Sequence, residues 1–208
     1  MVKTFGHHKH ATLPRPQLPN GAYSLTAAEV SRLIASARNL RDRVLLLLLS
    51  HTGMRRFEAA TITWGDIDME RRQLTVRSGK GGKQRVIPMT SQLSSELGRL
   101  AKHTNTGLVF QSRQAFGISV RQVNRIVAFA GNRAGIRHPN PRYRDVTCHL
   151  LRHSFARLWK ASGGSIETLS HLMGHSTPFL TQVTYGREGF LDVQRNFETT
   201  TKQMYKRK

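Results

Sequence analysis

The chain contains the stretch Cys148-His149-Leu150-Leu151-Arg152-His153-Ser154-Phe155-Ala156, which lies within a helical pattern from about Thr147 to Ser162. Residues three apart on a helix share a face, so the imidazole of His149 and the guanidinium of Arg152 can address one phosphate group together. We expect His153 on another face of this helix, in a structural role. The stretch therefore predicts a helix that presents a paired histidine and arginine to an anionic ligand.

Four further segments place phosphate-seeking or proton-handling side chains along the chain. They are Thr52-Gly53-Met54-Arg55, Gly79-Lys80-Gly81-Gly82-Lys83, Gly174-His175 and Tyr185. Breaking a DNA strand without a metal requires a nucleophile, neutralisation of charge on the phosphate and protonation of the departing 5′ oxygen. A tyrosine can form a covalent phosphotyrosine, guanidinium groups donate paired hydrogen bonds to phosphate oxygens, and a lysine or histidine can supply the proton.

The set and order of these motifs resemble the catalytic domain of tyrosine recombinases, the phage-integrase and Xer family of site-specific DNA strand-exchange enzymes. The resemblance runs from about Tyr23 to about Tyr185. It implies a site-specific recombinase or integrase that cuts and rejoins DNA through a covalent 3′-phosphotyrosine intermediate. It also implies the catalytic-domain fold of that family, with no metal and no cofactor.

Carried over residue by residue, the resemblance assigns the catalytic set Arg55, Lys80, His149, Arg152, His175 and Tyr185. Glu58 follows the first arginine by three residues and is expected to hold its guanidinium. Lys80 is preferred to Lys83 as the general acid because it matches the first lysine of the family pattern. Lys83 and Arg85 are expected to contact DNA. Tyr185 lies ten residues after His175, where the family usually has nine.

The charge of the chain points to a polyanionic partner. It has 33 Lys and Arg against 12 Asp and Glu, a formal net charge of +21 over 208 residues. An excess of this size is typical of nucleic-acid binding. The resemblance implies that the partner is double-stranded DNA and that the chain self-associates on it, from dimer to tetramer. The longest apolar run, Val44 to Leu49, is too short to span a membrane. With a lone Cys148 and no apolar signal stretch, we expect a cytoplasmic, nucleoid-associated protein.

Hydrophobic periodicity predicts a mostly α-helical fold with a small antiparallel β-sheet, an α+β class. Alternation in Gln73–Arg77 and Gln84–Pro88 predicts a β-hairpin with a basic, glycine-rich tip, paired with Ile67 to Met69. The other periodic segments are helical. The expected helices are Thr26 to about Ile34, Leu40–His51, Arg55–Thr61, Ser91–Lys102, Ser119–Ala134, Thr147–Ser162, Ile166–Met173 and Pro178–Tyr185.

Three segments are expected along the chain. Residues 1–22 predict a basic flexible arm, 23–186 the catalytic domain, and 187–208 a basic tail that packs on a neighbouring subunit. The short arm is compatible with either a minimal recombinase or a fragment of a longer one.

Two rival functions are compatible with the same residues. One is a nicking and closing enzyme of the type IB topoisomerase kind, although that family usually has lysine and arginine where this chain has His149 and Arg152. The other is a catalytically silent DNA-binding accessory protein, although every expected catalytic side chain is present.

Overall fold

The computed structural model describes residues 23–77, 84–112, 116–174 and 190–205 of the chain. The helices are α1 (Ala27–Ala35), α2 (Leu40–Thr52), α3 (Arg56–Thr61), α4 (Ser91–Ala101), α5 (Val120–Arg133), α6 (Cys148–Ala161), α7 (Ile166–Met173) and α9 (Phe190–Met204), with a 3-10 helix η1 at Trp64–Asp66. The strands are β1 (Ile67–Asp68), β2 (Gln73–Arg77) and β3 (Gln84–Pro88). The fold is mostly helical with one small antiparallel sheet, as the sequence predicted.

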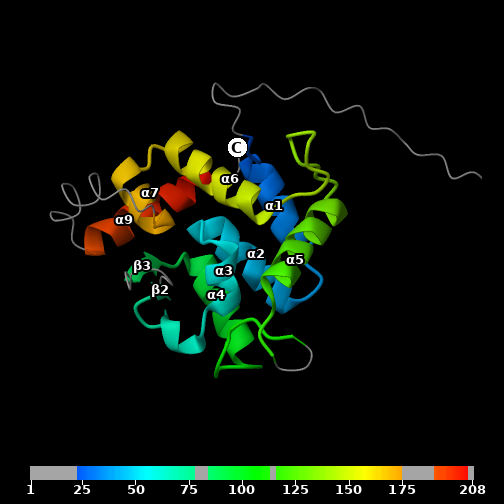
Figure 1. Cartoon of the computed structure of the whole chain (residues 1–208). Coiled ribbons are helices and arrows are strands. Elements are labelled where there is room, and N and C mark those ends of the chain that lie inside the picture. Colours follow the sequence, from blue (N-terminus) through cyan, green and yellow to red (C-terminus); the bar gives the residue numbers. More distant parts are fainter. Residues whose placement is uncertain (1–22, 78–83, 113–115, 175–189, 206–208) are drawn as a thin grey trace, which may run out of the picture.

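Helix α2 lies at the centre of the molecule, surrounded by α1, α3, α4 and α6 (Figure 1). Its residues from Val44 to Leu49 are all at most 1% exposed. A helix that is apolar on every side can only be stable when other elements cover every side. Gly53 ends the helix with a left-handed φ of 63°, which glycine adopts without a steric penalty.

The sheet has the strand order β1-β2-β3, and each neighbouring pair is antiparallel. The hairpin strands have the bounds that the alternation predicted, with Thr75 opposite Val86 in the register. Successive side chains of a strand point to opposite faces. In β3 this alternation places Arg85 on the same buried face as Ile87.

Helices α6, α7 and α9 cover the side of the molecule that also carries β3 (Figure 1). Phe197 of α9 is fully buried, and its ring centroid lies 6.0 Å from that of Trp159 on α6. Just beyond α9, the Tyr205 hydroxyl donates a hydrogen bond of 2.9 Å to the carbonyl of Ser50. Within the described part of the chain, α9 therefore belongs to the core of its own domain.

This placement of α9 differs from the expected tail at 187–208. Helix α9 packs on its own α6, α7 and β3, because its apolar positions meet a buried surface of the same chain. Packing of this segment on a neighbouring subunit stays a prediction. The expected arm at 1–22 and the expected helix at 178–185 lie outside the described residues. Among the helices that are described, none combines the length and the apolar character needed to cross a membrane.

Candidate active site

Arg55 stands at the turn between α2 and α3. The left-handed Gly53 ends α2, and Arg55 then occupies the N-cap position of α3. Its backbone N–H donates to Glu58 Oε2 at 2.7 Å, and its guanidinium donates to Glu58 Oε1 at 3.1 Å. The contact expected between Glu58 and Arg55 is therefore present. The Arg55 side chain is about half exposed, so its guanidinium stays accessible from solvent.

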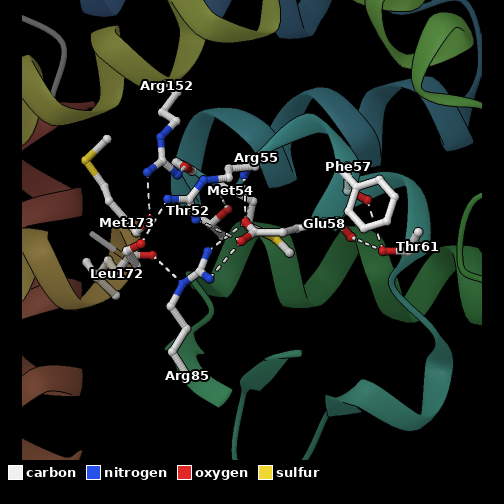
Figure 2. Close-up of polar contacts among 12 residues, drawn as sticks. Thr52, Met54, Arg55, Phe57, Glu58, Thr61, Arg85, Arg152, Leu172 and Met173 are labelled. Carbon is white, nitrogen blue, oxygen red and sulfur yellow. Dashed lines mark hydrogen bonds and ion pairs between the residues drawn. The ribbon is translucent and has the colours of Figure 1, made fainter. Parts of the chain in front are cut away.

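Arg152 reaches the same place from α6. Its side chain is buried, and it donates one hydrogen bond to the carbonyl of Gly53 and one of 2.6 Å to the carbonyl of Met173. Figure 2 shows the Arg152 and Arg55 side chains side by side at the end of α2. The two arginines that the sequence assigned to phosphate binding lie together, although 97 positions separate them in the sequence.

A third arginine completes the cluster. Arg85 of β3 donates to both oxygens of Glu58, at 2.8 and 2.7 Å, and the two side chains are each 8% exposed. Glu58 therefore accepts four hydrogen bonds, two from Arg85 and two from Arg55. A carboxylate offers about four lone-pair positions, so Glu58 is fully occupied.

The three guanidinium groups converge on the C-terminal end of α7. Arg85 Nε donates to Leu172 O at 2.9 Å, Arg152 to Met173 O at 2.6 Å and Arg55 to Gly174 O at 2.9 Å. The last carbonyls of a helix have no partner within the helix, and this end carries partial negative charge. Cations are therefore favourable partners here, and the three guanidinium groups hold the end of α7 in place (Figure 2).

The cluster carries an excess of positive charge. Three guanidinium groups against one carboxylate leave a local charge of +2. Burial, and after it the charge of Arg55, lowers the pKa of Arg152 to about 10, which leaves it charged at neutral pH. Burial alone would raise the pKa of Glu58, but the hydrogen bonds and charges of Arg85 and then Arg55 lower it below its usual value. An excess of this kind, near an accessible guanidinium, favours an anionic ligand.

His149 and His153 form a pair on the outer side of α6. Their Nε2 atoms are 2.8 Å apart and both residues are exposed. One ring must donate and the other must accept, so the two rings must adopt complementary tautomers. The expectation that His153 lies on another face was wrong, because residues four apart on a helix are neighbours. The ring of His153 is partly desolvated by its neighbours, and this partial burial, and after it the charges of His149 and Arg152, lowers the pKa of His153.

The remaining assigned residues fall into two groups. Lys80, Lys83, His175 and Tyr185 lie outside the described residues. Arg85 is described, and its buried pair with Glu58 departs from the expected DNA contact, because its guanidinium already donates to Glu58 and Leu172. Across the described ranges, no cluster of three His, Cys, Asp or Glu side chains is placed to hold a metal ion.

Sequence reasoning missed two parts of this site. The carbonyls of Gly53 and of the α7 end have no sequence signature, because every residue carries one. The inward position of Arg85 did have a signal, since strand alternation places it with the buried Ile87.

Comparison with known proteins gives a consistent result. A sequence model of the phage integrase family matches residues 23–189. The tyrosine recombinase XerA of Pyrococcus horikoshii is 34% identical over 177 residues, which cover 82% of this chain and 59% of the relative. The crystal structure of XerA recombinase superimposes with a TM-score of 0.68 at 27% identity, covering 87% of this chain and 65% of that one.

Lambda integrase shares the fold, with a TM-score of 0.60 at 23% identity over 74% of this chain and 47% of that one. The chain spans about three-fifths of the length of the curated relatives that it matches.

Proposed function

The chain belongs to the phage integrase family, and on this premise we propose that it is a site-specific DNA recombinase that cuts and rejoins strands through a covalent 3′-phosphotyrosine intermediate. The observation that carries the proposal is the convergence of Arg55 and Arg152, with Arg85 and Glu58, at one end of α7. We assign the catalytic domain to residues 23 to about 205, because α9 packs within it.

The charge of the cluster suits the proposed reaction. A phosphodiester carries one negative charge, and attack by a phenolate gives a pentavalent transition state with two. The local charge of +2 matches the transition state better than the ground state. Groups that are already in place where charge develops lower the barrier most. Arg55 and Arg152 would bind the non-bridging oxygens, since each guanidinium has five N–H donors and uses two in the contacts described above.

The proposed chemistry balances as follows. The phenolic oxygen of Tyr185 forms a bond to phosphorus and loses its proton, and the bond from phosphorus to the 5′ oxygen breaks. Lys80 would donate a proton to that oxygen, and His149 or His175 would accept the phenolic proton or bind the phosphate. Religation is the same step in reverse, with the 5′-hydroxyl of a partner strand as nucleophile.

The partner is double-stranded DNA. The net charge of +21 supports attraction to the phosphate backbone. The lambda integrase structure with the same fold is a tetramer bound to a Holliday junction, which supports assembly of this chain from dimer to tetramer on DNA. A protein with this activity would work in the cytoplasm on nucleoid DNA. The named relatives are recombinases, which disfavours the topoisomerase-like and silent accessory functions.

The proposal can be tested without knowledge of the target site. A pool of nicked duplexes with a randomised centre, incubated with the full chain, should yield covalent protein–DNA complexes that survive denaturation. The complexes should form in EDTA, and the trapped duplexes should share a common sequence. Absence of covalent complexes from the whole pool, under conditions in which the chain binds DNA, would contradict the proposed function.

A further inference from the structure

Arg85 occupies a buried place for a basic residue of a hairpin whose tip is expected to contact DNA. It lies in β3, five residues after Lys80 in the sequence, yet its side chain is only 8% exposed. Both terminal nitrogens donate to Glu58, and Nε donates to Leu172 O. A paired, fork-to-fork contact of this kind fixes orientation as well as distance.

Through these three bonds Arg85 joins three elements, β3, α3 and α7 (Figure 2). A second contact, between His171 Nε2 and Val86 O at 3.3 Å, also ties α7 to β3. Each of the three elements leads directly to a residue of the proposed chemistry. The hairpin carries Lys80, α3 begins beside Arg55, and α7 is followed by Gly174 and His175.

The fit of the α7 end around Arg85 is tight. Gly174 has a left-handed φ of 59°, and a Cβ on it would lie 2.8 Å from an Arg85 terminal nitrogen. Glycine is therefore needed at this position both for the backbone conformation and for the close approach of the guanidinium. The end of α7 and Arg85 thus fit as one unit.

Arg85 also sets the charge that Arg55 meets. With Arg85 in place, each oxygen of Glu58 accepts one hydrogen bond from Arg85 and one from Arg55. Without it, two acceptor positions of Glu58 would be released beside Arg55 and Arg152. The carboxylate would then compete with a phosphate for both guanidinium groups, and the local charge would fall from +2 to +1.

We propose that Arg85 is a positioning residue for strand cleavage, which acts by holding Glu58 against Arg55 and by fixing the end of α7, and which does not itself bind DNA. This inference rests on the proposed function. It replaces the DNA contact that the sequence suggested for Arg85.

The test compares Arg85→Gln and Arg85→Lys with the unmodified full chain. The control is Arg43→Gln, since Arg43 of α2 and Arg99 of α4 also pair with one buried glutamate, Glu96, outside the cluster; Arg43 is more exposed than Arg85 and makes one contact with its glutamate. The substrate is the nicked duplex that the unmodified chain traps best from the randomised pool. Three quantities are measured below the Tm of every variant, namely the rate of covalent complex formation at saturating protein, the DNA affinity and its salt dependence.

We expect Arg85→Gln to slow cleavage by about 10²-fold, the loss typical of a small misplacement of reacting groups. Arg85→Lys should lie between it and the unmodified chain, because an ammonium keeps the charge but cannot form the paired contact. Affinity and salt slope should change little, because a net charge of +21 spreads the attraction to DNA over many cations. A neutral methylphosphonate at the scissile position needs less charge neutralisation, so it should recover part of the rate lost in Arg85→Gln. Arg43→Gln should cleave at the unmodified rate.

Four results would overturn the inference. A fall of about one unit in the salt slope, with weaker binding and a normal rate at saturation, would make Arg85 a direct phosphate contact. Equal cleavage rates for Arg85→Gln and Arg43→Gln would leave Arg85 only a structural role. If Arg85→Gln does not fold, a normal cleavage rate for Arg85→Lys would lead to the same conclusion. If the unmodified chain traps no DNA, the proposed function fails and this inference fails with it.

Discussion

Replacing Gly53 by alanine tests whether the turn before Arg55 is as tightly packed as the structure indicates. Gly53 has a φ of +63°, and a Cβ on it would lie 2.5 Å from Cδ1 of the buried Phe155. The left-handed conformation costs an L-residue about 1–2 kcal/mol, and overpacking a core costs about 1–3 kcal/mol more. We therefore expect the free energy of unfolding to fall by about 2–5 kcal/mol, measured by urea denaturation followed by circular dichroism. A loss of about 3 kcal/mol corresponds to a Tm lower by about 6–12 °C in a chain of this length.

Gly135→Ala and Gly107→Ala are matched controls. Both glycines have left-handed φ values, 65° and 68°, but a Cβ on either meets nothing within 4 Å. Each should cost only the conformational part, about 1–2 kcal/mol. The Gly53 carbonyl also accepts a hydrogen bond from Arg152. Gly53→Ala should therefore cleave DNA more slowly even at temperatures well below its Tm, whereas the two control variants should cleave at the normal rate. Equal losses of stability in all three variants would refute the packing of Phe155 against this turn.

Three further predictions concern charge. Burial lowers the pKa of His51 from 6.5 to about 4, so between these pH values the unfolded chain binds a proton that the folded chain does not. The free energy of unfolding should therefore fall by about 3 kcal/mol as the pH drops from 6.5 to 4. In His51→Gln, denaturation curves recorded across this pH range should show most of that fall removed. The same fall in His51→Gln as in the unmodified chain would contradict this role of His51. Arg152→Ala should slow cleavage on the order of 10²–10³-fold while most DNA affinity is kept, and Arg152→Lys should not restore it, because an ammonium cannot replace the fork. Near-normal cleavage by either variant would show that the phosphate clamp is misassigned. The logarithm of the DNA affinity should fall steeply and linearly with the logarithm of the salt concentration. Cleavage should be unaffected by EDTA. Cleavage that stops with a chelator and returns with magnesium would contradict the metal-free reaction.

Local rules predicted the parts of the fold that local chemistry decides. The segments predicted as helices from Thr26 and from Leu40 are α1 and α2 in the structure, where Thr26 and Glu29 form the capping box that begins α1 and Gly53 ends α2 in the left-handed conformation. The hairpin strands Gln73–Arg77 and Gln84–Pro88 have the bounds that alternation gave. In each case the determining residues are neighbours in the sequence.

Long-range packing decided what the sequence did not predict. Helix α9 was expected only as a basic tail, because its stabilising partner is the surface around Trp159 of α6. The pairing of Arg85 with Glu58 joins residues 27 positions apart. From the local sequence alone, a basic residue near a glycine-rich hairpin tip predicts a DNA contact. Motif order predicted that Arg55 and Arg152 serve one site, and the structure places them together, but the carbonyls that orient them belong to the tertiary fold.

The identity of the nucleophile is the central claim, and one measurement tests it most directly. The chain should be trapped on a nicked duplex, the adduct digested with protease, and the DNA-linked peptide identified by mass spectrometry. The account predicts a 3′-phosphate joined to Tyr185, a free 5′-hydroxyl on the other fragment, and no adduct from Tyr185→Phe, which keeps the ring and removes the attacking oxygen. A DNA-linked peptide that lacks Tyr185, or an adduct formed by the phenylalanine variant, would contradict it.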